Sequence, residues 1–226
     1  MEEGKTKIWF VTLMLTVIAG YCDSITFVAA DKIFSAHVTG NFIVFAYQMI
    51  QGSDVEAWIK LLTFPIFMLS VMAGGWISAR FLNKHLILFW EGVLLVASGA
   101  IYYLLGNSHE DAKWLMYVVT MLVVFAMGLQ NAFGKLFAKD TYGPTTMMTG
   151  NVTQFALDLR SFCNSGFING DALSGVYKGL ITLCGFLLGC VLGAWAGKTI
   201  GLFGILFPGV AMIICYFSTN KKTIVS

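Results

Sequence analysis

The sequence predicts an all-α integral membrane protein of about six transmembrane helices, built as two three-helix repeats that face opposite ways in the bilayer. Three observations support this prediction: the chain carries few charges, it contains six long apolar stretches, and one polar motif occurs twice. Of its 226 residues, 58% are hydrophobic and 12% are charged, about half the charged fraction of a soluble domain. Residues 1–226 are therefore expected to form a single membrane domain, with repeat one at 1–107 and repeat two at 108–220.

Six stretches of the chain are apolar and long enough to span a bilayer, which takes about 20 residues of helix. The first follows Lys5 and Lys7 as a secretory signal would, but it lacks a small-residue cleavage site, so we expect it to be retained. The six predicted helices cover residues 8–28, 58–79, 86–105, 114–133, 176–197 and 201–217.

A Thr-Gly-Asn motif lies at residues 39–41 and again at 149–151. Each copy follows an apolar stretch that carries a polar cluster, at 20–24 and 128–132; the clusters are 108 residues apart and the motifs 110. Polar groups at membrane depth are costly, so their duplication indicates a site. Glycine frees the backbone there, and Thr and Asn can satisfy exposed polar groups, so each motif is expected in a broken or re-entrant segment.

Small residues recur at four-residue spacing in the predicted helices 58–79 and 176–197. This spacing lets helix backbones approach closely in lipid. We therefore expect close packing, either between the two halves or between the protomers of a homo-oligomer. The helix-packing residues Ser70, Gly74 and Ser78 align with Gly189, Gly193 and Gly197 at an offset of 119, and Gly185 adds a further rung.

The distribution of Lys and Arg favours the six-span topology, because cytoplasmic loops are richer in positive charge. If the motif segments enter and return without crossing and the N-terminus is inside, ten of these residues lie inside and four outside. If the motif segments cross, giving eight spans, the split is eight to six. Three crossings in each half invert one half relative to the other and place both termini in the cytoplasm. Inverted repeats place a binding site near the midplane, at discontinuous helices.

The two polar regions resemble the paired signatures of the YoaK-like family, a family of small bacterial membrane proteins of unknown function. The matching residues are 20–27, Phe34 and 37–41 for the first signature and 128–132 and 145–151 for the second. Cys22 departs from the family pattern, in which an aliphatic residue precedes the aspartate. The resemblance covers nearly the whole chain and implies a multi-pass protein of the bacterial inner membrane. It supplies no substrate and no activity.

Asp23 is the leading candidate site residue, for proton coupling or for binding a ligand, and Asn131 is its counterpart in the second half. A carboxylate within a membrane segment tends to take up a proton, to pair or to bind a cation. The alternative is a structural acid that hydrogen-bonds a broken helix.

Thr39 and Asn41, with Thr149 and Asn151, are expected to line a polar cavity from two sides. If each motif begins a half-helix, its free N–H groups favour an anionic or polar ligand group. In the alternative, these side chains only cap their own helices. The duplication does not separate the two interpretations, because caps would be duplicated too.

Gln130 completes the predicted substrate-binding residues, although it and Asn131 could instead hydrogen-bond across the bundle. His37 can titrate near neutral pH, but it is expected at the outer interface, and Glu91 is expected to reach an interface as well. The chain has no C-x-x-C pair, no Gly-rich phosphate loop and no H-E-x-x-H or G-x-S-x-G motif. We therefore expect no enzyme, no cofactor and no metal site; an intramembrane hydrolase built on Asp23 and His37 is the weaker alternative.

These features favour a secondary transporter or facilitator of a small polar solute, with a midplane site at Asp23 and the paired Thr-Gly-Asn breaks. Its partners would be the lipid bilayer and that solute, since no basic tract suits nucleic acid. The alternative is a non-transporting membrane scaffold or assembly protein that uses its glycine ladders to hold a partner.

Overall fold

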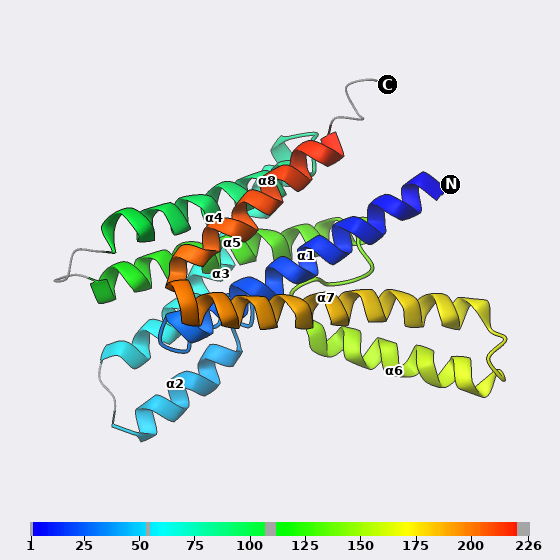
Figure 1. Ribbon diagram of the computed structural model, residues 1–226, viewed down its shortest axis with the longest axis horizontal. Helices are drawn as coiled ribbons and strands as arrows, with labels where there is room; N and C mark the ends of the chain where they lie inside the picture. The colour runs from blue at the N-terminus through cyan, green and yellow to red at the C-terminus, as the bar shows by residue number, and fades with distance from the viewer. Residues whose placement is uncertain (1, 53–54, 107–111, 221–226) are drawn as a thin grey trace.

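The computed structural model describes residues 2–52, 55–106 and 112–220, and the regular structure in these residues is helical (Figure 1). The boundary predicted between the repeats, at 107–108, lies outside the described residues. The helices are α1 (Glu2–Ala29), α2 (Gly40–Ile50), α3 (Val55–Arg80), α4 (Leu86–Leu105), α5 (Ala112–Leu136), η1 (Ala138–Asp140), α6 (Met148–Asn164), α7 (Gly170–Ile200), η2 (Gly201–Ile205) and α8 (Leu206–Asn220).

Five apolar segments of the described residues are long enough to cross a membrane. Four of them fall in α1, α3, α4 and α5, and the fifth, Gly170–Phe217, is 48 residues long and contains both α7 and most of α8. The prediction of an all-α membrane protein with about six long apolar helices is therefore confirmed. The two Thr-Gly-Asn motifs stand at the starts of the shorter helices, α2 with 11 residues and α6 with 17.

The first helix of each half packs along the third helix of the other half. Thus α1 lies along α7, and α5 lies along α3. The short helices stay within their own half, because α2 packs on α3 and α6 packs on α7, while α4 and α8 pack on each other. In Figure 1, α2 runs from the middle of the molecule to the lower left and α6 runs to the lower right, whereas the start of α1 and the end of α8 lie on the same side.

Glycines of α7 bring its backbone into direct contact with α1. A Cβ atom at Gly189 would lie 2.1 Å from the carbonyl oxygen of Val17, and one at Gly193 would lie 2.2 Å from another carbonyl oxygen of α1. Gly185 and Gly197 also face α1. A side chain at the two central positions would force the helices apart, so glycine sets this spacing.

The contact between α3 and α5 also depends on small residues. The Ser70 hydroxyl donates to the backbone carbonyl of Phe125, and a Cβ atom at Gly74 would lie 2.6 Å from the Cβ of Ala132. Ser78 lies half-buried one turn further along α3. Small residues of both ladders thus face helices of the same chain.

Candidate functional site

In the first half of the chain, the backbone turns back along α1 before α2 begins. Asp23 lies six residues before the end of α1, about 9 Å along the helix axis. Its Oδ1 nevertheless accepts the backbone N–H groups of Ala36 at 2.8 Å and His37 at 3.2 Å. Asp31 and Lys32, with φ of 50° and 60°, reverse the chain direction. The first connection therefore returns into the bundle and is anchored there by Asp23.

Asp23 and His37 also pair through their side chains. The Nδ1 atom of His37 lies 2.5 Å from Oδ2 of Asp23, and Asp23 is only 4% exposed. The hydrogen bond that the imidazolium donates to Asp23 raises the pKa of His37 above its ordinary value, although burial acts in the opposite direction. The sequence analysis expected His37 at the outer interface, and the structure adds that it contacts the leading site residue.

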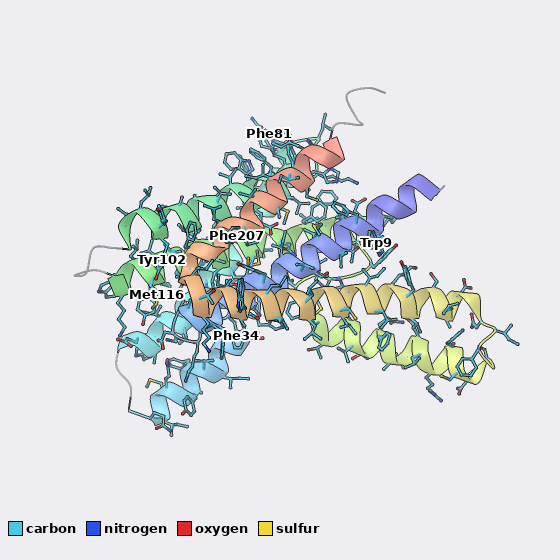
Figure 2. The ribbon with its side chains drawn as sticks, viewed as in Figure 1. Trp9, Phe34, Phe81, Tyr102, Met116 and Phe207 are labelled. Atoms are coloured by element: carbon cyan, nitrogen blue, oxygen red, sulfur yellow. The ribbon has the colours of Figure 1, made fainter. Side chains whose placement is uncertain are left out.

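A cavity of about 650 Å³ lies beside this pair, between α1, α2 and α7. The ring of His37 meets Phe34, which Figure 2 labels near the start of α2, and Phe186 edge-on, with ring centroids 6.2 and 5.8 Å away. Because Nδ1 faces Asp23, Nε2 is the nitrogen that His37 has left for a ligand. The wall is mostly apolar and consists of Asp23, Ser24, Phe27, Val28, Phe34, His37, Gly40, Ile43, Val44, Phe186, Cys190 and Ala194.

Asn41 holds the first turn together. It is fully buried; its Oδ1 accepts the N–H of Phe34 at 2.8 Å, and its Nδ2 donates to the carbonyl oxygen of Phe34 at 2.8 Å and to the hydroxyl of Thr63 at 3.0 Å. Thr39 occupies the N-cap position of α2 without a side-chain hydrogen bond to the helix. Within the first motif, Gly40 is the residue that lines the cavity.

The second half makes a similar turn, held by the amide pair of α5. Gln130 donates to the carbonyl oxygen of Leu15 at 2.8 Å and to the hydroxyl of Thr145 at 2.9 Å. Asn131 donates to the hydroxyl of Thr146 at 2.7 Å. These amides tie the returning chain to α5, and Gln130 also ties α5 to α1.

Asn151 repeats part of the role of Asn41. Its Nδ2 donates to the carbonyl oxygen of Pro144 at 2.6 Å, seven residues earlier, as Asn41 donates to Phe34. Proline has no N–H, so Oδ1 of Asn151 lacks the donor that Phe34 gives to Asn41. Thr149 lies exposed in the first turn of α6.

A second cavity, of about 170 Å³, lies between α6, α7 and the connection before α6, and Asn151 lines it. Thr182 of α7 also lines it, and Phe186, one turn further along α7, lines the first cavity. The two cavities therefore have lining residues one helical turn apart on α7, although none lines both. Among the described residues, neither cavity contains residues of both Thr-Gly-Asn motifs, which were predicted to line one cavity from two sides.

A family model described as a protein of unknown function, DUF1275, matches residues 11–218. The chain belongs to this family. The match covers nearly all of the chain and agrees with the resemblance to the YoaK-like family. No curated protein and no solved structure matches the chain. The function of this DUF1275 protein therefore has to be argued from its site.

Glu91 is a residue whose environment the sequence did not show. It was expected to reach an interface, but in α4 of this DUF1275 protein it is fully buried, and neither carboxyl oxygen has a hydrogen-bond partner. Helix α4 packs on the next helix, α5, and on α8, which is distant in sequence, so no local pattern reveals the burial. No group of three or more His, Cys, Asp or Glu side chains in the described part of the chain could hold a metal ion.

Lys60 of the DUF1275 protein stabilises the first turn through Asp31 and does not line the cavity. It is fully buried in α3 and its ammonium group bonds the carboxylate of Asp31. The hydroxyl of Tyr117 on α5 also donates to Asp31, at 3.4 Å, and the Lys60 ammonium lies 5.9 Å from the centre of the Tyr117 ring. The turn that carries His37 is thus held by residues from both halves of the chain.

Proposed function

We propose that this protein is a secondary transporter or facilitator for a small polar solute, and that Asp23 and His37 form its solute or proton site. The observation that carries the proposal is that the buried carboxylate of Asp23 pairs with the partly exposed imidazole of His37 beside a cavity of about 650 Å³, formed where the chain turns back along α1. Ionisable groups among membrane-spanning helices are costly and typically mark solute or proton pathways. The largely apolar wall favours a solute with an apolar part beside its polar group.

The chemistry of the pair suits proton-linked binding. His37 is the residue type that changes charge near neutral pH, and its raised pKa increases the fraction of imidazolium there. An imidazolium held by Asp23 through Nδ1 can donate a hydrogen bond through Nε2 to an acceptor in the cavity. Loss of the proton removes that charge, so solute affinity and protonation would be linked.

The two cavities, with lining residues one helical turn apart on α7, would together supply a path along that helix. Phe186 stands between them, because it lines the first cavity and lies one turn from Thr182 of the second. Its ring also meets His37 edge-on. We infer that Phe186 is the barrier that separates the two cavities and that its displacement would connect them.

The helix arrangement supports alternating access. Each half would contribute three crossings and one re-entrant short helix, α2 or α6, and the two halves would be inverted relative to each other. The α1–α7 and α3–α5 contacts join the halves at small residues, and sliding at these smooth contacts would open the path to one side at a time. The excess of Lys and Arg on one side favours the bacterial inner membrane with both termini in the cytoplasm.

The scaffold alternative receives less support. It requires the glycine ladder to face a partner protein, yet Gly185, Gly189 and Gly193 of α7 are all covered by α1 of the same chain. A homo-oligomer would therefore have to use other surfaces.

A thermal-shift screen of the purified protein against small solutes tests the proposed site. A solute that binds the folded state raises the melting temperature as its concentration exceeds the dissociation constant. We expect at least one solute to stabilise the unmodified protein and the Asp171→Asn control, whose exposed acid at the start of α7 lines neither cavity. That solute should not stabilise Asp23→Asn or His37→Gln; the proposed site is contradicted if every stabilising solute shifts all four proteins equally.

A further inference from the structure

A buried polar cluster in the first half of the chain has a counterpart of the same residue types in the second half. Lys60, Thr63 and Asn41 are all fully buried. The Thr63 hydroxyl donates to the carbonyl oxygen of Lys60 at 2.6 Å and accepts from Asn41 at 3.0 Å. The ammonium group of Lys60 is neutralised by the carboxylate of Asp31. Every charge in this cluster is therefore matched within the chain.

The same three residue types recur in the second half, but there they line the cavity of about 170 Å³. These residues are Lys178, Thr182 and Asn151, and the Thr182 hydroxyl donates to the carbonyl oxygen of Lys178 at 2.9 Å, as Thr63 does to Lys60. Lys178 lies 5.8 Å from the centre of the Tyr142 ring. Unlike fully buried Lys60, Lys178 is exposed, and it forms none of the ion pairs found among the described residues.

The cavity also contains acceptors that suit a cation. Asp158 lines it, held by a hydrogen bond from Gln154 at 3.0 Å. The Oδ1 atom of Asn151 is a second acceptor, because Pro144 lacks the N–H that would occupy it. Lys178 and Asp158 thus place opposite charges on the wall of one small cavity without pairing with each other.

We propose that this cavity binds a small zwitterion of the α-amino-acid type. Its carboxylate would bind Lys178, as Asp31 binds Lys60, and its ammonium group would bind Asp158 and Oδ1 of Asn151. The volume of about 170 Å³ far exceeds the roughly 10–15 Å³ that one water needs, so several heavy atoms fit. Such binding would deepen the proposed transport function by naming a class of solute. Zwitterion binding is measured without any transport assay, so the binding proposal and the transport proposal can each be contradicted independently.

Calorimetric titration of the purified full-length protein with glycine, acetate and methylammonium tests the charge assignment. Glycine is expected to bind more tightly than either single-charge probe. Lys178→Gln should weaken glycine binding at least tenfold and abolish acetate binding, whereas Asp158→Asn should weaken glycine and leave acetate unchanged. Lys198→Gln is the matched control, since this exposed lysine of α7 lines neither cavity, and it should bind as the unmodified protein does.

Two further variants test the geometry without removing a polar group from the cavity. Pro144→Ala restores an N–H for Oδ1 of Asn151 and should weaken glycine binding. Gly175→Ala should also weaken it, because the new Cβ would lie 2.4 Å from Oδ2 of Asp158 and push the carboxylate aside. Melting curves confirm that each variant is folded. Failure of glycine to bind the unmodified protein at tens of millimolar, or equal glycine binding by folded Lys178→Gln, would overturn the proposal.

Discussion

Asp23 binds His37 twice, through the backbone N–H and through the imidazole ring, across 14 positions of sequence. One carboxylate therefore both closes the first turn and raises the pKa of the histidine that faces the cavity of about 650 Å³. The structure of the turn and the chemistry of the site consequently depend on the same residue.

The coupling between Asp23 and His37 predicts how thermal stability changes with pH. A pKa that is raised in the folded state contributes stability below the unfolded value of about 6.5, and this contribution is lost as pH rises through the folded value. The melting temperature of the unmodified protein should therefore fall as pH increases through that range. In Asp23→Asn the raised pKa of His37 should be lost, so the fall should be smaller. Melting curves between about pH 5 and 9 measure both slopes, and parallel slopes would contradict the coupling.

The two motif asparagines should differ in their effect on stability. Asn41 makes three hydrogen bonds to the turn and α3, whereas Asn151 makes one to a backbone oxygen and a long, weak one to the sulfur of Met148. At about 1 kcal/mol for each bond, Asn41→Ala should lower the free energy of unfolding by about 3 kcal/mol and Asn151→Ala by about 1 kcal/mol. Denaturant unfolding in detergent measures the difference. A larger loss of unfolding free energy for Asn151→Ala than for Asn41→Ala would show that these hydrogen bonds do not determine the stability of the turns.

The sequence predicted the long apolar helices, because apolar length is a local signal. It singled out Asp23 and the polar residues of the two motif regions as ligand-binding, and that role stays a prediction. It joined Asp23 and His37 only in the weaker hydrolase alternative and could not establish their contact, since that contact depends on where residues 30–39 fold back. Nor could the sequence show that Oδ1 of Asn151 lacks a backbone N–H donor at Pro144, because the missing N–H matters only once folding brings the two residues together.

The burial of Glu91 and Lys60 was hidden for the same reason. Glu91 and Lys60 both lie near the predicted start of an apolar helix, and packing against other helices is what buries their side chains. The separate cavities also follow from tertiary structure: each motif segment packs on the third helix of its own half, so the motifs do not share one wall.

Glycine at the α1–α7 contact should be irreplaceable even by alanine. In Gly189→Ala the new Cβ would lie 2.1 Å from a backbone oxygen of Val17, which cannot move without separating the helices. We expect a loss of about 3 kcal/mol in unfolding free energy. Gly75→Ala is the matched control, because nothing lies within 4 Å of its Cβ, and alanine there should stabilise the helix by up to about 1 kcal/mol. Similar unfolding free energies for the two variants would refute the close contact.

The two fully buried charges should respond in opposite ways to removal. Glu91 has no hydrogen-bond partner for either oxygen, so Glu91→Leu should leave thermal stability unchanged or raise it. Lys60→Met removes the partner of Asp31 and should cost about 3 kcal/mol. Paired melting curves decide the matter, and strong destabilisation by Glu91→Leu would mean that this carboxyl group has a structural partner.

Uptake by proteoliposomes tests the central claim of transport most directly. Vesicles containing the protein are incubated with a defined pool of amino acids, amines, carboxylates and sugars, and their contents are measured by mass spectrometry. We predict saturable uptake of at least one pool member into vesicles with the unmodified or Asp171→Asn protein, and none above empty vesicles with folded Asp23→Asn. Absence of uptake by the unmodified protein, or undiminished uptake by Asp23→Asn, would contradict a transport path through the Asp23–His37 site.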